Sequence, residues 1–483
     1  MKVIKNFIDG NWEVGHVTEY LDVINPSSGE IIGKVPVSSR EPVDKAVIAA
    51  SEAFKAWSEI PAVKRTRYLA RLLELMNENY EELSKLISID EGKNLVDARA
   101  EMKRAIENLE VAIGTPSLLS GEYLENIADG IDGYVFKQSM GVFAVICPFN
   151  FPLMVPFWFF PYALATGNTV IVKPSEQVPL CMDRIAELTC LAGFPRGIFN
   201  IIHGTKEVSE ALVEHPGIAG VSFVGSTPVA KSVARKAAEY GKRYQCFGGA
   251  KNYFVVMPDA NMEKVISSLM TSCYGCAGER CMAASVVVGV GEIYDEIKNK
   301  FIEAAKNLVI GNALDEKTDV GPVISKKAKE RIIGLINKGI EEGATLLLDG
   351  RNIVVEGYEN GFYVGPTIFE NVTWDMEIMK TEIFGPVVCL VKTETFEEAL
   401  CHMNSSKYGN GASIFTRSGY YAREFQRLAR VGMVGINIGV PAPVALFPFG
   451  GEKQSMFGNI KAQSKGILDF FTTKKIVTSR FFE

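Results

Sequence analysis

The sequence lacks an uninterrupted apolar segment of the ~20 residues that a membrane-spanning helix needs. One apolar run, residues 151–165, is shorter and is interrupted by Pro152, Pro156 and Pro161. Proline disrupts a helix because it has no N–H group to donate, so this run predicts a buried core segment. The first residues, Met-Lys-Val-Ile-Lys-Asn-Phe, contain no apolar region of a signal peptide. We therefore expect no membrane partner.

Disulfide, zinc and nucleic-acid signatures are missing as well. The nine cysteines show no paired framework of the secreted type, which fits the reducing cytosol and predicts a cytoplasmic protein. Cys273, Cys276 and Cys281 lie close enough in sequence to suggest zinc, but no fourth ligand follows at a usual spacing, so no metal is expected. No block of basic residues stands out in a chain of net charge −6, which argues against a nucleic-acid partner.

The length and composition indicate a globular protein of several domains. A chain of 483 residues is too long for one hydrophobic core, so two or three domains are expected. Hydrophobic residues make up 47% and charged residues 22% of the chain, which is typical of a water-soluble fold.

The first third of the chain predicts short strands followed by a helical layer. Apolar residues and turn residues alternate in 8–12 and 24–29, which indicates strands and hairpins. From residue 43, apolar side chains recur at the spacing of one helix face. Further helical patterns cover residues 65–77, 81–90 and 97–113.

The middle of the chain predicts a parallel sheet. Short apolar strands alternate with helical patterns, which is typical of βαβ units with both faces of the sheet covered. The expected strands are residues 142–146, 169–173, 198–202 and 220–224, and the expected helices are residues 155–165, 180–192, 207–214 and 228–240. This α/β architecture is that of a dinucleotide-binding domain, whose ligand lies at the carboxyl ends of the strands.

A second α/β block begins near residue 251 and runs to about residue 435. Residues 254–257 predict a strand and residues 262–272 a helix. The tail, residues 467–478, is apolar and β-prone, so we expect it to pair with another part of the structure or with another subunit.

Two motifs at strand ends could hold a dinucleotide, although the G-x-G-x-x-G fingerprint is absent. Ser226 lies between a strand and a helix, where backbone N–H groups can bind a phosphate; a plain helix cap is the alternative. Lys173 and Glu176 follow another strand and could bind ribose hydroxyls, with the carboxylate disfavouring a 2′-phosphate.

Cys281 is the candidate nucleophile. It ends the loop Gly275-Cys-Ala-Gly-Glu-Arg-Cys281, whose small residues let a substrate approach the backbone. The neighbouring Arg280 is expected to lower the pKa of the thiol and raise its thiolate fraction. A thiolate in such a loop suits covalent catalysis on a carbonyl. The alternative is that Cys281 is one buried structural thiol among nine.

Taken together, five motifs resemble the aldehyde dehydrogenase superfamily over essentially the whole chain. They are Pro148-Phe-Asn-Phe-Pro152, Lys173-Pro-Ser-Glu176, Phe223-Val-Gly-Ser-Thr227, Gly278-Glu-Arg-Cys281 and Glu382-Ile-Phe-Gly-Pro386. The resemblance implies a Rossmann-type NAD-binding domain (residues 1–120 and 142–248) and an α/β catalytic domain (residues 249–440). It also implies a small β oligomerisation element (residues 121–141 and 455–483) of a homodimer or homotetramer.

The same resemblance implies roles for individual residues. Cys281 is expected to be the nucleophile, and Asn150 with the Cys281 backbone N–H is expected to form the oxyanion hole. Glu382 is expected to hold the nicotinamide ribose. The alternatives are a turn residue for Asn150 and a solvated helix-end charge for Glu382. Further NAD contacts are expected from Cys147, Phe149, Lys173, Glu176, Gln177, Ser226 and Gly248.

One departure from the superfamily pattern bears on the reaction. Most members carry a glutamate, the base for water attack, four residues before the lysine that is Lys251 here, and Phe247 takes its place. A phenyl ring cannot accept a proton from water, so another acceptor must release the acyl group. The methylmalonate semialdehyde dehydrogenase subfamily, which this chain resembles, also lacks that glutamate and uses coenzyme A. Gly385 and Ala230 are smaller departures from these patterns.

The resemblance therefore implies NAD-dependent oxidation of malonate or methylmalonate semialdehyde to acetyl-CoA or propionyl-CoA, with loss of CO2. A hydrolytic aldehyde dehydrogenase for another small aldehyde and a non-catalytic NAD-binding protein are the alternatives. Arg280 is expected to bind the substrate carboxylate through its planar guanidinium, with Arg104 as a second cation. The alternatives are thiolate activation alone for Arg280 and a solvated helix face for Arg104.

Overall fold

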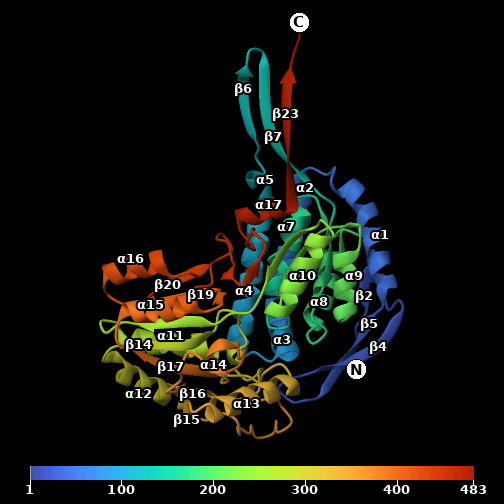
Figure 1. Ribbon diagram of the computed structural model, residues 1–483. Helices are drawn as coiled ribbons and strands as arrows, with labels where there is room; N and C mark the ends of the chain where they lie inside the picture. The colour runs from blue at the N-terminus through green and yellow to red at the C-terminus, as the bar shows by residue number, and fades with distance from the viewer. Residues whose placement is uncertain (1, 483) are drawn as a thin grey trace.

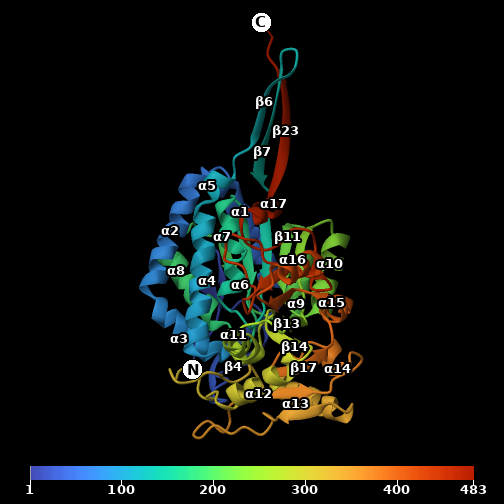
Figure 2. The same cartoon turned by 90° about the vertical axis from the view of Figure 1, so that its left-hand side faces the viewer.

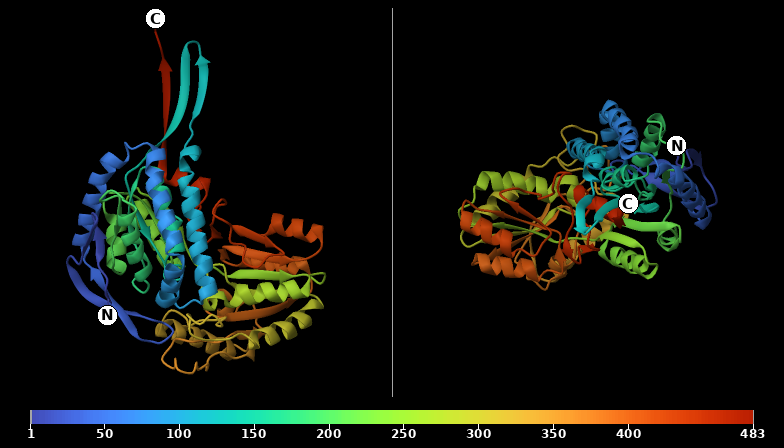
Figure 3. Two further views of the ribbon diagram at one scale, coloured as in Figure 1. Left: turned by 180° about the vertical axis from the view of Figure 1, so that it is seen from behind. Right: turned by 90° about the horizontal axis from the view of Figure 1, so that it is seen from above.

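The computed structural model, which describes residues 2–482, contains two large sheets that form separate lobes (Figure 1, Figure 3). The first sheet has eight strands in the order β22-β12-β11-β8-β9-β10-β2-β3. Its five central strands are parallel, and antiparallel strands close both edges. The strands are β2 (Asn6–Ile8), β3 (Asn11–Glu13), β8 (Val142–Ile146), β9 (Thr169–Lys173), β10 (Phe199–Ile201), β11 (Ile218–Val224), β12 (Arg243–Phe247) and β22 (Met456–Phe457).

Helices cover both faces of this sheet because its strands are apolar on both sides. In β8, Phe143 and Val145 face one core cluster, whereas Val142, Ala144 and Ile146 face the other. This alternation is the period of two of an extended strand. On the first side lie α2 (Ala62–Glu78), α3 (Tyr80–Glu91), α4 (Leu95–Ile113), α6 (Met154–Phe157), α7 (Phe160–Ala165) and α8 (Leu180–Leu191), and on the other α1 (Arg40–Trp57), α9 (Lys206–Glu214) and α10 (Thr227–Glu239). The predicted helical layer and the parallel sheet are confirmed.

The helix expected over residues 155–165 is wrong as a single element. The structure divides it into α6 and α7, with Trp158 and Phe159 between them. Pro161 stands in the first turn of α7, where its missing N–H costs no hydrogen bond. A continuous helix would need that N–H, so the segment breaks there.

The second sheet has seven strands in the order β15-β16-β17-β14-β13-β19-β20 and lies in the other lobe. All its neighbouring strands are parallel except β15 and β16. The strands are β13 (Asn252–Val256), β14 (Ala284–Val290), β15 (Thr345–Leu348), β16 (Thr367–Glu370), β17 (Val387–Thr393), β19 (Gly411–Phe415) and β20 (Met433–Ile436). The helices are α11 (Met262–Tyr274), α12 (Ile293–Lys306), α13 (Lys326–Glu341), α14 (Glu377–Lys380), α15 (Phe396–Ser405) and α16 (Gly419–Leu428). The predicted second α/β block is confirmed.

A three-stranded antiparallel sheet, made of β6 (Glu122–Ala128), β7 (Ile131–Ser139) and β23 (Thr472–Arg480), projects from the body (Figure 1, Figure 2). Thr472 pairs with Ser139 and Arg480 with Ile131, so the predicted pairing of the tail is confirmed within one chain. The preceding tail residues belong to the body, because β22 pairs with β12 and α17 (Leu468–Phe471) is buried. The oligomeric role of residues 121–141 and 455–483 stays a prediction.

The N-terminal segment adds a smaller sheet at the side of the first lobe. It contains β1 (Lys2–Val3), β4 (Val17–Ile24) and β5 (Ile31–Ser38), which agrees with the predicted strands and hairpins. Within residues 2–482, no helix combines the length and the apolar character that crossing a membrane requires.

Candidate functional site

A deep cleft opens at the carboxyl ends of the parallel strands of the first sheet and reaches the second lobe. Residues that directly follow β8, β9, β11 and β12 line it, as the parallel topology requires. Its walls contain seven of the predicted cofactor residues, which are Cys147, Phe149, Lys173, Glu176, Ser226, Gly248 and Glu382, together with Asn150 and Cys281. Gln177 is not in the wall; its backbone N–H donates to Ser175 Oγ at 3.3 Å.

The part of the cleft nearest β9 presents a cation and an anion. Lys173 Nζ lies 2.9 Å from Glu176 Oε2, and the lysine is almost completely buried. Ser226 is the N-cap of the 13-residue helix α10, and its side chain caps none of the helix N–H groups. The positive end of α10 therefore faces the cleft, beside a pair of residues suited to ribose hydroxyls.

Glu382 lies at the opposite wall, just after α14. Its Oε1 accepts a hydrogen bond from the Ala250 N–H at 2.9 Å, and burial raises its pKa to about 7. Lys251 Nζ fixes α14 and its C-terminal end by donating to the carbonyls of Ile378, within the helix (2.6 Å), and Thr381, just after it (3.1 Å). Glu382 is thus a held carboxylate in the wall rather than a solvated charge at a helix end.

The Cys281 loop has an unusual backbone. After α11, Cys276, Ala277 and Gly278 have φ values of 49°, 51° and 73°, all in the left-handed region. Only Gly278 adopts it freely, and a Cβ there would lie 2.2 Å from the Gly385 carbonyl oxygen. The carbonyl of Cys281 then accepts hydrogen bonds from the Nδ2 atoms of Asn252 and Asn410, at 2.9 Å each. These contacts fix the backbone of the candidate nucleophile.

The expected low pKa of the Cys281 thiol is wrong, although Arg280 acts on it in the expected direction. Burial, with a further contribution from Glu382, raises the pKa of Cys281 to about 12, and Arg280 lowers it only slightly. The guanidinium is directed elsewhere: it forms an ion pair with Asp97, and its Nε donates to Cys276 Sγ at 3.1 Å. Although Arg280 is next to Cys281 in the sequence, its guanidinium pairs with Asp97 and Cys276 rather than with the Cys281 thiol.

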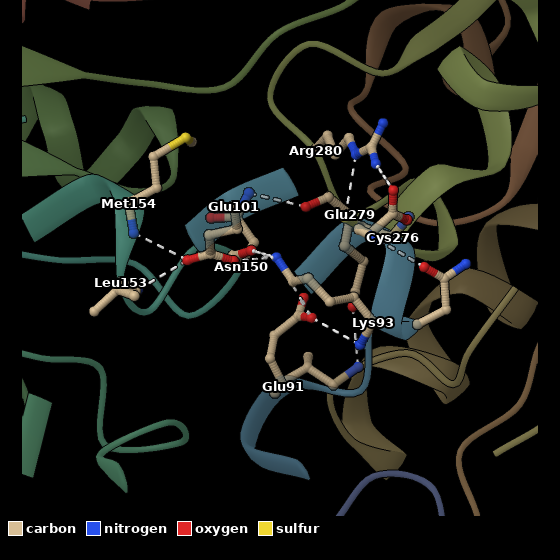
Figure 4. Close-up of polar contacts among 12 residues, drawn as sticks. Glu91, Lys93, Glu101, Asn150, Leu153, Met154, Cys276, Glu279 and Arg280 are labelled. Atoms are coloured by element: carbon tan, nitrogen blue, oxygen red, sulfur yellow. Dashed lines mark hydrogen bonds and ion pairs between the residues drawn. The ribbon is translucent and has the colours of Figure 1, made fainter. Parts of the chain in front are cut away.

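Asn150 lies in the same wall as Cys281 and is held at two points. Its side-chain Nδ2 donates to the Glu279 backbone carbonyl at 2.8 Å, and its backbone carbonyl accepts from Lys93 Nζ at 2.6 Å (Figure 4). One amide hydrogen remains for a ligand, because an Nδ2 group carries two. The arrangement suits an oxyanion donor better than a turn residue.

A second cavity meets the cleft at Cys281, which lines both. Its wall contains Arg280 and Arg104 together with two carboxylates and two amides, those of Asp97, Glu101, Asn108 and Gln463. The remainder is apolar and includes Phe151, Met154, Trp158, Met282, Val440 and Phe449. Arg104 is half-buried and pairs with Glu107 at 2.7 Å. Both predicted substrate arginines thus line one cavity with the thiol, and the choice between a substrate contact and a solvated helix face for Arg104 stays a prediction.

Phe247 ends β12 and is buried in an aromatic cluster. Its ring centroid lies 6.0 Å from that of Phe159 and 6.5 Å from that of Phe449, which lines the second cavity. The Glu279 carboxylate does not replace the missing base, because its Oε2 accepts from the Ile324 N–H at 3.0 Å and it lines neither cavity.

Three residues that contribute to the site were not predicted from the sequence. Arg331, on α13, lines the cleft and lies 3.4 Å from the Phe384 carbonyl oxygen. Lys93 Nζ donates a hydrogen bond to the Asn150 backbone carbonyl, and Asn410 Nδ2 donates one to the Cys281 backbone carbonyl. Nothing in the spacing of these residues indicates the site. For Lys93 the available signal was a charged residue between Gly92, which ends one helix, and Asn94, which caps the next.

Comparison with known proteins gives consistent relatives. The model of the aldehyde dehydrogenase family matches residues 12–477. A malonate-semialdehyde dehydrogenase of Oceanobacillus iheyensis is 46% identical over 100% of this chain and 99% of the relative, as is one of Geobacillus kaustophilus. A solved methylmalonate-semialdehyde dehydrogenase of Oceanimonas doudoroffii has a TM-score of 0.98 at 43% identity, covering 100% of this chain and 99% of its own. A structure from Sinorhizobium meliloti, described as a methylmalonate-semialdehyde dehydrogenase complexed with NAD, has a TM-score of 0.99 at 43% identity with the same coverage.

Proposed function

The chain belongs to the aldehyde dehydrogenase family, and from this premise we propose that it oxidises malonate or methylmalonate semialdehyde and passes the acyl group to coenzyme A. The observation that carries the proposal is the position of Cys281. It lies where a dinucleotide-type cleft meets a cavity with two arginines, and no acidic residue occupies position 247. The names of the relatives agree with this choice of substrate.

The cleft fits NAD residue by residue. The N-terminus of α10 at Ser226 would hold a phosphate, the Lys173–Glu176 pair a ribose, and Glu382 the nicotinamide ribose. Cys147, Phe149 and Gly248 complete this wall. NAD, when bound, supplies the acceptor for the hydride that leaves the substrate carbon.

Cys281 and Asn150 perform the covalent steps. The Cys281 Sγ attacks the aldehyde carbon as a thiolate, and the carbonyl oxygen becomes an oxyanion. The free N–H of the Asn150 amide and the Cys281 backbone N–H stabilise that charge. Loss of the hydride re-forms the carbonyl and leaves a thioester on Cys281. The thiolate of coenzyme A then displaces Cys281 and carries the acyl group away.

Arg280 and Arg104 would hold the substrate's carboxylate in the second cavity. A semialdehyde of the malonate type carries that charge two bonds from its aldehyde carbon, and both guanidinium groups share the cavity with Cys281. Once the thioester has formed, the C–C bond to the carboxylate breaks and the group leaves as CO2, free or hydrated to bicarbonate. The electron pair of that bond passes to the thioester as an enolate, which takes up a proton from solvent before coenzyme A reacts. Water attack is slow because Phe247 accepts no proton.

The protein would work as a cytoplasmic homodimer or homotetramer. The projecting sheet exposes Tyr123, Leu124 and Ile476, each at least 64% accessible. Such an apolar strand surface is normally covered by another chain. Residues 121–141 and 455–483 would supply this contact.

Formation of NADH from malonate and methylmalonate semialdehydes, measured with and without coenzyme A, tests the proposal. We expect fast turnover with coenzyme A. Without it we expect a burst of about one NADH per active site, followed by a slow phase. Fast turnover to the free acid without coenzyme A would establish the hydrolytic alternative. If no small aldehyde yields NADH, the alternative of a non-catalytic NAD-binding protein would be favoured.

A further inference from the structure

Lys93 is completely buried in the short connection between α3 and α4. Its side chain has 0% exposure, as does the side chain of Glu101, its partner. The connection turns tightly: Gly92 has φ = 102°, and a Cβ there would lie 3.0 Å from Pro322. Asn94 then caps α4 by accepting from the Asp97 N–H at 2.8 Å. The backbone of Lys93 is therefore fixed between two helices.

The ammonium group of Lys93 contacts the loop that carries Asn150 (Figure 4), and Lys93 lines neither the cleft nor the second cavity. Its Nζ lies 2.6 Å from the Asn150 carbonyl oxygen, 2.7 Å from Glu101 Oε2 and 4.0 Å from the centroid of the Phe151 ring. An ammonium carries three N–H donors, so one group can serve these acceptors together. Charge-assisted bonds of this kind are about twice as strong as neutral ones.

Glu101 extends the contact along the same loop. Its Oε1 accepts from the backbone N–H groups of Leu153 (2.8 Å) and Met154 (3.0 Å). Lys93 and Glu101 thus hold the loop at one carbonyl and two N–H groups. The opposite side of Asn150 is held by the Glu279 carbonyl, two residues before the nucleophile.

We propose that Lys93 is a positioning residue that sets the oxyanion hole by fixing the Asn150 carbonyl, with Glu101 fixing the rest of the loop. The inference rests on the proposed function, because it requires Asn150 to act on the oxyanion. Without the Lys93 ammonium, the buried Asn150 backbone carbonyl loses its charged donor. The buried carboxylates of Glu101 and Glu91, which lie 2.7 and 3.7 Å from Lys93 Nζ, lose their counter-charge. The loop must then rearrange to satisfy them. A shift of about 1 Å in a catalytic group is enough to lower a rate substantially.

A double-mutant cycle between Lys93→Met and Asn150→Ala tests this, with NADH formation from propanal as the readout. We expect Lys93→Met alone to lower kcat/KM by about 10- to 100-fold, part of the 10²–10³-fold value of one oxyanion donor. In the Asn150→Ala background, Lys93→Met should lower it less than about threefold, because the group it positions is already gone. NAD affinity should stay within about twofold, since Lys93 does not line the cleft.

Alkylation of Cys281 by iodoacetamide separates positioning from general damage. This reaction displaces iodide from carbon and creates no oxyanion, so Lys93→Met should alkylate Cys281 within about threefold of the wild-type rate. Lys242→Met is the matched control, because Lys242 is also a buried lysine that donates to backbone carbonyls, those of His215 and Ile218. It should lower thermal stability but leave kcat/KM within about twofold in both backgrounds.

Two results would overturn the inference. Equal losses from Lys93→Met with and without Asn150 would show a structural role, and wild-type kcat/KM in Lys93→Met would show no role. Should Lys93→Met not fold, Lys93→Met/Glu101→Gln removes one charge of each sign. Its glutamine oxygen still accepts from Leu153 and Met154, and the same outcomes apply. Failure of the proposed function would appear separately, in the wild-type enzyme, as no NADH from propanal or from either semialdehyde.

Discussion

Replacing Arg280 by leucine tests whether this side chain recognises the substrate carboxylate. We expect kcat/KM for malonate semialdehyde to fall roughly 30- to 1000-fold. This corresponds to a loss of about 2–4 kcal/mol of transition-state stabilisation, which is the scale of removing one partner of a buried charge pair. The structure supports a value in this range, because the Arg280 side chain is only 14% exposed and lines the cavity that contains Cys281. On propanal, which has no carboxylate, most of the activity should remain.

The structure also identifies a loss that both substrates share. Arg280 forms an ion pair with Asp97, whose carboxylate is 11% exposed and also accepts from the Cys276 N–H at 2.7 Å. Removing the guanidinium leaves this carboxylate uncompensated and strains the Cys281 loop, whatever the substrate. The informative quantity is therefore the ratio of kcat/KM for malonate semialdehyde to that for propanal, in which the shared loss cancels.

The measurement is initial-rate NADH formation with both aldehydes at saturating NAD and coenzyme A. Arg280→Leu/Asp97→Asn is the matched control, because it removes the unpaired charge along with the guanidinium. The ratio should fall in both variants, whereas the propanal rate should recover in the double variant. A ratio equal to that of the wild type would rule out the clamp and leave Arg280 as a support of the Cys276–Cys281 loop.

Three further predictions concern the thiols and the cofactor. Cys281→Ala should abolish aldehyde oxidation, whereas Cys276→Ala, which loses only the contact with Arg280 Nε, should weaken it; equal losses in NADH assays would contradict the assignment. NAD should be preferred over NADP by at least roughly tenfold, because Glu176 repels a 2′-phosphate; Glu176→Gln should reduce the ratio of the two kcat/KM values, and an unchanged ratio would remove this residue from cofactor choice. Since the pKa of Cys281 in the free enzyme is raised to about 12, its thiolate fraction and iodoacetamide alkylation rate should rise about tenfold per pH unit between pH 7 and 9; a plateau below pH 8.5 would show a lower pKa.

The cleft could be predicted from the sequence because parallel strands bring their carboxyl ends to one edge. Lys173 and Ser226 are far apart in the chain, but Lys173 ends one predicted strand and Ser226 closely follows another. The topology then leaves one place for them to meet. Resemblance to a family added Glu382, which no spacing rule connects to this edge.

The contacts behind the site could not be predicted in the same way. Lys93 resembles an ordinary solvated connection residue, and only the fold shows that it is enclosed and faces a carbonyl 57 positions later. The left-handed backbone conformations of Cys276 and Ala277 could not be predicted from the sequence either, because cysteine and alanine disfavour them. Tertiary contacts impose that backbone, and they also turn Arg280 away from its sequence neighbour.

The projecting sheet and the buried α17 make the first lobe dependent on residues that are synthesised about 300 positions after it. Asn168 Nδ2 donates to the carbonyl of Phe471 at 2.8 Å across a separation of 303 residues. At about 5–20 residues per second, a ribosome needs roughly 15–60 s to add that length. Until then β7 has an unpaired edge, and the Phe143 ring lacks the Phe470 and Phe471 rings that later cover it. Nascent chains of this protein therefore present an open strand and an apolar surface to one another, which makes crowded polysomes the setting in which it is most prone to aggregate.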